Sequence, residues 1–471
     1  MRAESHDTTA PNSSLPNGAS ARIQQLHVVY APEDEDSPGD RHRKGALRAA
    51  VDADELVLGR EPEGPRTLVL TDRRVSRNHA AVIRNRATGE VDIVDRRSRH
   101  GTIVGGKPVD RAKLTHGSVI RLGRTILVYT DTLLRMDEAK ALAPETAALR
   151  GTSLAMQRLR GEIALVAPRT LPVLILGETG VGKERAAHEI HRQSGRCGPF
   201  VAVNCAAIAP TLAEAELFGH AQGAFTGATQ KNEGLFVAAD KGTLFLDEIA
   251  ELPAGLQPKL LRALATGEIR ALGRTEPRFV DVRIVAATHG DLEGAVTGGG
   301  FRGDLLARLA GWIARIPALR ERREDILGLA QFFLQREAPR TRLSSACAEA
   351  LVLYDWPFNV RELEQVLAAA TIRAREGTIR IEHLPESIAG PVLSRAPAFE
   401  PDAPAPLLQA LVPPDAPPDA AGLLRVVRAH HGNVAQVAAY FGKDRKQIYR
   451  WAEKLGVDIE SVRDADDGND A

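Results

Sequence analysis

The sequence predicts a multidomain protein with an all-β sandwich, an α/β domain that carries a helical lid, and a small all-α module. From residue 22 to about 132, short apolar runs alternate with Gly, Pro, Asp and Asn, a pattern typical of a sandwich. From 150 to about 320, apolar runs alternate with helix-like segments, as in a parallel sheet covered by helices. Near the end of the chain, two short amphipathic segments flank Gly442 and predict the helical module.

Composition excludes several classes of protein. Of the 471 residues, 44% are hydrophobic and 26% charged, which are ordinary values for a folded protein. Lys and Arg number 61, as do Asp and Glu, so contact with nucleic acid requires a local basic patch. Three cysteines without C-x-x-C spacing support neither a zinc finger nor a disulfide framework. No apolar run approaches a membrane helix and no signal segment opens the chain, so we expect a cytoplasmic protein without membrane contact.

Changes in composition along the chain set the expected boundaries. We expect a disordered tail over 1–21, the β domain over 22–135, the α/β subdomain over 150–320, the helical lid over 321–389, a Pro-rich linker over 390–420, the helical module over 421–458 and an acidic tail over 459–471.

The apolar runs predict the strands of the first two domains in order. In the β domain these runs lie at 23–30, 55–59, 68–70, 80–85, 90–95, 101–106, 118–123 and 125–129. In the α/β subdomain they lie at 173–176, 200–203, 243–248 and 283–288.

A glycine-rich loop follows the strand at 173–176 and precedes a helix-like segment. The run Gly177-Glu178-Thr179-Gly180-Val181-Gly182-Lys183 has the G-x-x-x-x-G-K spacing of a phosphate-binding loop in its required strand–loop–helix context. Backbone N–H groups and the helix N-terminus can bind phosphates, and Lys183 can reach the β- and γ-phosphates of ATP. The generic motif has Ser or Thr where Glu184 stands.

Two carboxylates follow the strand that ends at Leu246. An apolar strand that delivers Asp247 and Glu248 is typical of a Walker B element. Asp247 is expected to hold Mg²⁺, and Glu248 to polarise the water that attacks the γ-phosphate.

These motifs give the segment from 151 to 389 a resemblance to the AAA+ domain of bacterial enhancer-binding proteins, which activate sigma-54 RNA polymerase. The most specific element is Gly223-Ala224-Phe225-Thr226-Gly227-Ala228, which resembles the loop with which this family contacts sigma-54. The preceding Glu216-Leu217-Phe218-Gly219-His220 is also similar to the family, in which Glu after the loop lysine is usual.

The resemblance implies further roles in ATP binding and hydrolysis. Asn204 is similar to the Asn that pairs with the Walker B Glu, and Thr288 to sensor I. Arg302 and Arg308 resemble arginine fingers that act in trans, which implies a homo-oligomer, a hexamer by family analogy. Arg361 resembles sensor II, which contacts the nucleotide. The family has Asn where His289 stands and Gly where Phe358 stands.

Residues 423–457 have the features of a helix-turn-helix. Lys454 is one of five basic residues in its second half, against Asp444 and Glu453. The segment resembles the Fis-type DNA-binding module, and the alternative is an ordinary helical hairpin. The candidate DNA-binding residues are Lys443, Arg445, Lys446, Gln447 and Arg450.

The β domain resembles a forkhead-associated (FHA) domain at Gly59-Arg60, at Ser76-Arg77-Asn78-His79 and at Ser98-Arg99-His100-Gly101-Thr102. This resemblance implies a sandwich that binds phosphothreonine through loops at one end, with Arg60 and Ser76 on the phosphate and His79 bracing the loop. Arg77, Arg99 and His100 complete the candidate phosphopeptide site. The family has Asn where His100 and Gly105 stand, so a phospho-independent interaction module is the alternative.

Together these features predict an ATP-driven transcription activator that binds enhancer DNA and remodels the sigma-54 holoenzyme. Its FHA domain would respond to a phosphothreonine protein or a Ser/Thr kinase. Two other hypotheses stay open. One is a non-catalytic DNA-binding scaffold that recognises phosphothreonine, motivated by His289 and Phe358; the other is an AAA+ remodeller of a different client, against which the Gly223–Ala228 loop argues.

Overall fold

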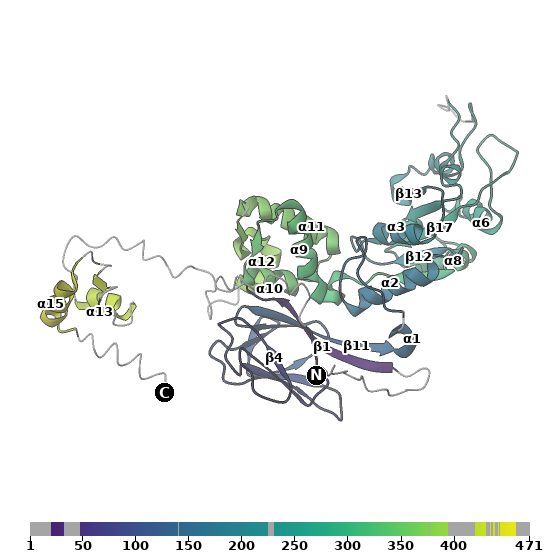
Figure 1. Cartoon of the computed structure of the whole chain (residues 1–471). Helices are drawn as coiled ribbons and strands as arrows, with labels where there is room; N and C mark the ends of the chain where they lie inside the picture. The colour runs from purple at the N-terminus through teal and green to yellow at the C-terminus, as the bar shows by residue number, and fades with distance from the viewer. Residues whose placement is uncertain are drawn as a thin grey trace, which may run out of the picture. The chain divides into compact units, whose positions relative to one another are not determined.

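The computed structural model describes residues 20–32, 48–139, 141–224, 230–375, 377–393, 420–429 and 443–457, together with Val434, Val437, Ala438 and Phe441. The chain divides into two compact units, residues 1–401 and 402–471. Figure 1 shows the elements of each unit. Nearly all of the predicted tails and linker lies outside the described residues. Within the described part of the chain, no helix is long and apolar enough to cross a membrane.

The first domain is a sandwich of two sheets, as predicted. One sheet has the strand order β2-β1-β11-β10-β7-β8 and the other β4-β3-β5-β6-β9. All neighbouring strands are antiparallel except β3 and β4. The strands are β1 (Ser20–Tyr30), β2 (Arg48–Ala50), β3 (Glu55–Gly59), β4 (Thr67–Val69), β5 (Ala80–Arg84), β6 (Val91–Asp95), β7 (Thr102–Val104), β8 (Lys107–Val109), β9 (Arg111–Leu114), β10 (Ser118–Leu122) and β11 (Thr125–Arg135).

All eight strands predicted in this domain are present, and β2, β8 and β9 are additional. The additional strands are short, and two of them are rich in Arg, Lys and Pro, so they lack the apolar runs on which the prediction rested. β1 begins at Ser20, before the predicted strand at 23–30 and the predicted domain boundary at 22, because Ser20 pairs with Arg135 of β11. The prediction of a disordered tail is therefore wrong for its last two residues.

The second domain contains a five-stranded parallel sheet with the order β13-β14-β17-β12-β18. β12 (Val173–Leu176), β14 (Thr243–Asp247) and β17 (Arg283–Thr288) are its central strands, and their near-continuous burial explains why they are apolar runs. The edge strands are β13 (Phe200–Asn204) and β18 (Trp312–Arg315), and the second was not among the strands predicted from the sequence. The helices and short elements around the sheet are α2 (Leu154–Val166), α3 (Lys183–Gln193), η1 (Cys205–Ala207), α4 (Ala213–Phe218), α5 (Leu235–Ala238), η2 (Ile249–Glu251), α6 (Gln257–Thr266), β15 (Glu268–Ile269), β16 (Arg278–Phe279), α7 (Leu292–Thr297) and α8 (Gly303–Leu309), with α1 (Met136–Ala139) before them.

The lid is helical, as predicted, with one short parallel strand pair. Its elements are η3 (Leu319–Asp325), α9 (Ile326–Glu337), β19 (Arg342–Leu343), α10 (Ser345–Leu353), α11 (Asn359–Ala374), β20 (Thr378–Ile379), η4 (Ile381–His383) and α12 (Glu386–Leu393). The predicted end of the lid at 389 is too early. Helix α12 continues to Leu393, because Val392 as well as Ile388 packs against the apolar core of the lid.

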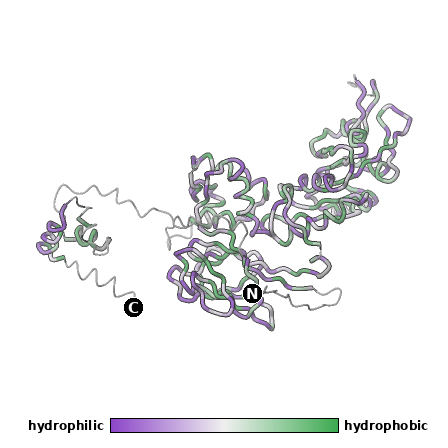
Figure 2. The backbone as a smooth tube through the Cα atoms, in the orientation of Figure 1, coloured by the Kyte–Doolittle hydropathy of each residue, from purple (hydrophilic) through white to green (hydrophobic). Residues whose placement is uncertain are grey.

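The sandwich and the lid share apolar contacts within the first unit. Alternate residues of β11 face opposite ways, so that Leu127 and Tyr129 belong to the sandwich core while Ile126 and Val128 belong to the core of the lid. Arg121 of β10 forms an ion pair with Glu349 of α10, with a Nε–Oε2 distance of 2.9 Å. Hydrophobic segments run through the strands and lid helices, and hydrophilic stretches mark many of the loops (Figure 2).

The second unit contains α13 (Ala420–Ala429) and α15 (Arg445–Leu455). Leu423 and Val427 of α13 pack with Val437, Phe441 and Ile448, so the helices share one small apolar core. Asp444 caps α15 by accepting a hydrogen bond from the backbone N–H of Gln447 at 2.7 Å. Gly442, the predicted turn residue, lies outside the described residues.

Candidate functional site

The carboxyl ends of four parallel strands meet at one edge of the α/β sheet. Leu176 of β12 is paired with Thr288 of β17, and Asn204 of β13 with Asp247 of β14. Residues that follow these strands must therefore gather at this edge, which is where open α/β sheets bind ligands. The register thus brings together the glycine-rich loop, the two Walker B carboxylates, Asn204 and Thr288.

The glycine-rich loop has the geometry of a phosphate cradle. Gly180 and Gly182 have φ angles of 80° and 104°, in the left-handed region that Gly adopts without strain. A side chain on Gly180 would also place a Cβ only 2.1 Å from the carbonyl oxygen of Phe358. Helix α3 begins at Lys183, whose Nζ donates to Gly177 O at 3.0 Å. Loop and helix N-terminus together form an anion site.

A cleft of about 300 Å³ lies over this loop. Of the predicted nucleotide-site residues, it is lined by Thr179, Gly180, Val181, Gly182, Lys183, Glu184, Asn204, Asp247, Glu248 and Arg361. Three others are not among its lining residues. Gly177 accepts the Lys183 bond, Glu178 faces the lid, and Thr288 is fully buried with its Oγ1 accepting from the Gly290 N–H at 2.9 Å.

The two Walker B carboxylates have pKa values that are shifted in opposite directions. Burial raises the pKa of Asp247, and the neighbouring Glu248 raises it further. Burial also acts to raise the pKa of Glu248, but hydrogen bonds from His289 and the charge of Lys183 outweigh it, so its pKa lies below the ordinary value. Such a separation keeps Glu248 ionised, as a base that polarises water must be.

Asp247 fits the oxygen chemistry of a Mg²⁺ ligand. Its side chain lies at the cleft, where burial and the charges of Glu248 and Glu184 disfavour the ionised form. A divalent cation would relieve that charge, and Mg²⁺ is commonly bound by one or two carboxylates together with substrate phosphates. The residues present therefore fit Mg²⁺ that arrives with ATP.

The lid closes the cleft on the side of the glycine-rich loop. The guanidinium of Arg320 donates to both carboxylate oxygens of Glu178, which lowers the pKa of Glu178 to about 2. Asn359 donates from Nδ2 to Glu178 Oε2 at 3.1 Å and to Thr179 O at 3.0 Å. The backbone N–H groups of Val360 and Arg361 donate to Gly180 O.

Phe358, where the resembling family has Gly, adopts an ordinary backbone conformation with φ of −107°. The left-handed conformations fall on its neighbours Trp356 and Asn359, with φ of 52° and 55°. The phenyl group is 59% exposed, so it needs no room inside the lid. The Phe is therefore accommodated beside the nucleotide site without backbone strain of its own.

Several other residues that line the cleft were not predicted from the sequence. They are Leu149, Arg150, Met156, Arg322, Leu329, Phe332 and Phe333. The Arg150 guanidinium lies over the Phe332 ring, 3.7 Å from its centroid. Most of these residues are apolar or aromatic and carry no fixed spacing in the sequence, so only the folded arrangement identifies them as cleft residues.

In the β domain, two candidate phosphate-binding loops are bonded to each other. The backbone N–H of Arg60 donates to Ser76 O at 3.0 Å, and that of Arg99 donates to Ser76 Oγ at 3.1 Å. A Cβ on Gly59 would lie 1.7 Å from Arg77 O, so only Gly permits this approach. Arg60, Arg77 and Arg99 are exposed around the half-buried Ser76. The loops thus place three guanidinium-bearing residues around one hydroxyl, a suitable donor set for a phosphate.

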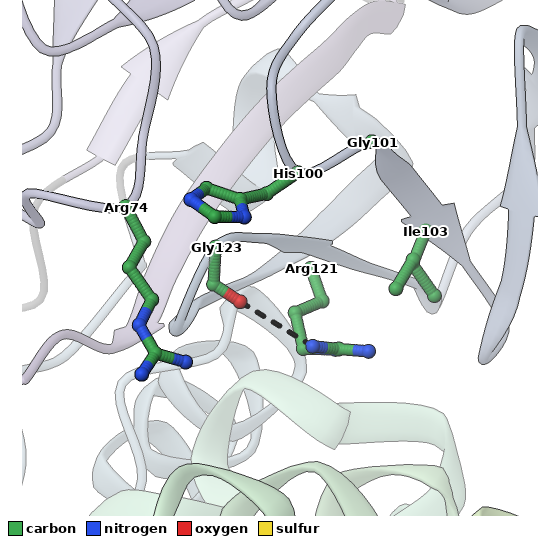
Figure 3. A pocket seen from close by; sticks show the side chains of 6 residues that line it. All are labelled: Arg74, His100, Gly101, Ile103, Arg121 and Gly123. Atoms are coloured by element: carbon green, nitrogen blue, oxygen red, sulfur yellow. Dashed lines mark hydrogen bonds between the residues drawn. The ribbon is translucent and has the colours of Figure 1, made fainter. Parts of the chain in front are cut away.

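His79 braces these loops, as predicted. Its Nδ1 accepts from the Ser76 N–H at 3.1 Å, so the neutral ring carries its proton on Nε2 and donates to Gly101 O at 3.2 Å. Burial lowers the pKa of His79, which keeps the ring neutral. His100 lines a small adjoining pocket with Arg74 and Arg121 (Figure 3). Burial, with the charges of Arg74 and Arg99, lowers the pKa of His100.

Three family models match the chain. The sigma-54 interaction domain matches residues 149–313, the AAA+ ATPase lid domain 320–398 and the FHA domain 56–123. The anaerobic nitric oxide reductase transcription regulator NorR of Aeromonas salmonicida is 43% identical over 346 residues, which cover 69% of this chain and 67% of that protein. The chain belongs to the family of sigma-54-dependent transcriptional regulators.

One further relative and one solved structure are also similar to this chain. The nitric oxide reductase transcription regulator NorR1 of Cupriavidus necator is 44% identical over 330 residues, 65% of this chain. The chain spans 63% of that relative's length. The structure of NtrX from Brucella abortus in complex with ATP has 32% sequence identity and a TM-score of 0.47, and the match covers 68% of this chain and 71% of that one.

The two arginines predicted to act in trans lie on and just before α8. Arg302 and Arg308, at α8, are exposed; Arg302 pairs with Asp304 at 2.7 Å and Arg308 donates to Leu264 O at 3.5 Å. Neither lines the nucleotide cleft of its own chain. Of the predicted sigma-54 contact loop, Gly223 and Ala224 are described, whereas Phe225, Thr226, Gly227 and Ala228 lie outside the described residues.

The candidate DNA-binding residues lie on α15 and just before it. Arg445, Lys446 and Arg450 are exposed on the helix, Lys443 is exposed just before it, and Gln447 is half-buried. Ile448 and Ala452 are buried in the core of the unit. The helix therefore presents a basic face opposite the side that packs.

Proposed function

We propose that this regulator is an ATP-driven activator of sigma-54 RNA polymerase, which binds enhancer DNA through α15 and is controlled through phosphothreonine recognition by its FHA domain. The observation that carries this proposal is the cleft in which Lys183, Asp247, Glu248 and Arg361 converge on a phosphate-binding loop. This is the residue set that ATP hydrolysis requires: a phosphate-binding cation, a metal ligand, a base and a lid cation.

Each residue has a role that follows from its chemistry. Lys183 and the N-terminus of α3 bind the β- and γ-phosphates, and Arg361 contacts them from the lid. Asp247 would hold Mg²⁺, which would compensate phosphate charge when bound. Glu248, kept ionised, orients and polarises the water that attacks the γ-phosphate.

The exposed arginines at α8 complete the site in an oligomer. Arg302 and Arg308 of one subunit reach the nucleotide of the next and stabilise the charge that develops on the transferred phosphoryl group. A ring follows from this arrangement, and we propose a homohexamer. Hydrolysis then moves the loop at 223–228, whose Phe225 and Thr226 engage sigma-54 and remodel the closed complex.

Retention of sigma-54 by the purified full chain tests the motor and its partner together. With ADP and a transition-state mimic of the γ-phosphate, we expect capture of sigma-54 that is absent with ADP alone. Thr226→Ala should lose capture and keep hydrolysis, while the matched control Thr229→Ala, just beyond the hexapeptide, should keep both. Hydrolysis without capture by the wild type would favour another client, and absence of any hydrolysis would favour the non-catalytic scaffold.

Phosphothreonine recognition is tested separately by peptide binding. Arg60→Ala and Ser76→Ala should each weaken binding of a phosphothreonine peptide at least about tenfold, because charge-assisted bonds to phosphate contribute about 1.5–3 kcal/mol each. Arg111→Ala, which removes a surface arginine paired with Asp92, is the control. Equal affinity for the unphosphorylated peptide would favour the phospho-independent module.

A further inference from the structure

The side chain of Glu248 is shared between two donors from different elements. Its Oε1 lies 3.3 Å from Lys183 Nζ, and its Oε2 lies 2.7 Å from His289 Nδ1. The backbone N–H of His289 also points to Oε2, at 3.3 Å. An ionised carboxylate only accepts hydrogen bonds, so Nδ1 of His289 carries a proton.

The arrangement of neighbouring strands brings these two residues together. β14 and β17 are adjacent and parallel, Glu248 follows β14, and His289 follows β17. Glu248 has a left-handed backbone with φ of 51°, which is uncommon for a non-glycine residue and recurs at functional sites. Thr288 is fully buried, and the alternation along the strand turns His289 outward toward the carboxylate.

Asn204 makes a different bond in this structure. Its Oδ1 accepts from the backbone N–H of Ala206 at 2.9 Å and so caps the turn η1. The direct side-chain contact to Glu248 Oε2 comes from His289, which follows β17, and not from Asn204 of β13.

We infer that His289 is a positioning residue for ATP hydrolysis, which holds the Glu248 carboxylate through Nδ1 in the orientation that polarises the attacking water. This inference rests on the proposed ATPase function. When ATP binds, Lys183 exchanges Glu248 Oε1 for phosphate oxygens. Oε1 then becomes free to accept a hydrogen bond from water, while His289 keeps Oε2 and thereby the direction of the carboxylate.

The alternative is that the imidazole only fills space, and two matched variants separate these roles. Asn places an amide N–H near the position of imidazole Nδ1, whereas Gln is closer to His in size but places its amide one bond further out. His289→Asn therefore keeps the donor and loses volume, and His289→Gln keeps volume and displaces the donor. The His289 side chain is 53% exposed, which leaves room for either substitution.

Turnover and nucleotide affinity are measured on the full chain for four variants. They are His289→Asn, His289→Gln, His289→Ala and the surface control Glu293→Ala. We expect His289→Ala to lower kcat about 10- to 100-fold, the loss typical when a catalytic group is misaligned, with the Kd for a fluorescent ATP analogue changed less than about twofold. His289→Asn should recover most of kcat and His289→Gln little of it. Glu293→Ala, exposed on α7, should match the wild type.

A second readout does not depend on turnover. With ¹⁵N-labelled histidine, nucleotide-free protein should show a resonance of a ring protonated at Nδ1 that disappears in His289→Asn. Glu248→Ala should shift that resonance toward the Nε2–H form, because its acceptor is gone.

The outcomes separate this inference from the proposed function. If the wild type hydrolyses ATP but His289→Gln is as active as or more active than His289→Asn, the positioning role is overturned and the ATPase stands. The positioning role is also overturned if the Nδ1–H resonance does not change in Glu248→Ala. If the wild type lacks turnover, both fail.

Discussion

Asn359, at the start of α11, donates from Nδ2 to Glu178 Oε2 at 3.1 Å, although the two residues lie 181 positions apart in the sequence. Asn359 is fully buried and has a left-handed backbone with φ of 55°. Its Nδ2 also donates to Thr179 O, and its Oδ1 accepts from the Leu319 N–H at 2.7 Å. One side chain thus joins the phosphate-binding loop to both the first turn of the lid and α11.

We expect Asn359→Ala to destabilise the protein by about 2–4 kcal/mol, since it leaves buried donors and acceptors unpaired and forces Ala into a left-handed conformation. Asn359→Gly should cost less, because it removes the bonds without the backbone strain. The free energy of unfolding in urea measures both. Equal effects of Ala and Gly would mean that the backbone conformation contributes nothing.

Asn359→Asp changes the size of the side chain very little, yet it should weaken nucleotide binding. Asp keeps an acceptor for the Leu319 N–H but sets a second carboxylate beside Glu178, whose pKa is still lowered by its hydrogen bonds from Arg320. Like charges at this distance repel, so we expect the lid to separate from the loop and the Kd for a fluorescent ATP analogue to rise at least about tenfold. An unchanged Kd would show that this junction does not govern the nucleotide site.

The Arg121–Glu349 pair should contribute to stability chiefly because replacing Arg121 removes an opposite charge from beside the buried Glu349 carboxylate. The Glu349 side chain is 5% exposed and that of Arg121 is 19% exposed. Arg121→Met should lower the free energy of unfolding by about 3 kcal/mol, and the double variant Arg121→Met with Glu349→Gln should recover most of it. Arg111→Met, from the exposed pair with Asp92, should change it by less than about 1 kcal/mol. If the double variant instead lowers the free energy of unfolding by the sum of the effects of Arg121→Met and Glu349→Gln alone, the two charges do not stabilise each other.

The three cysteines should differ in reactivity toward a thiol-alkylating reagent. Burial raises the pKa of Cys205 to about 12 and that of Cys347 to about 12, and both are inaccessible, whereas Cys197 is exposed. At pH 8 we expect one rapidly labelled thiol in the native protein and three after denaturation, counted by mass spectrometry. Rapid native labelling of Cys205 would show that the turn η1 opens.

If α15 binds DNA through phosphate contacts, Lys446→Ala with Arg450→Ala should weaken binding at all DNA sequences. Each lost phosphate contact lowers the slope of log K against log salt by about 0.9, so the pair should lower it by about 2. Glu453→Ala, exposed on the same helix, is the control. A fluorescence anisotropy titration at several salt concentrations measures this slope, and an unchanged slope would remove these two residues from the interface.

The local parts of the site could be predicted from the sequence. The loop at 177–183 and the pair Asp247-Glu248 depend on short-range order, a strand followed at once by glycines or carboxylates. In the β domain, the resemblance to FHA domains implied that His79 braces the loops, and its two ring bonds confirm it. Short polar strands such as β8 and β9 were missed, because pairing with neighbours rather than their own apolar pattern makes them strands.

By itself, the sequence determined the types of domain, the family and the place of the glycine-rich loop and the two carboxylates, because these depend on composition and on short motifs. Only the tertiary structure decided which distant groups meet. The order β14-β17-β12 sets His289 against Glu248, and the packing of the lid sets Asn359 and Arg320 against Glu178. Such pairs are separated by 41 to 181 residues and follow from strand order and helix packing, which no local spacing encodes.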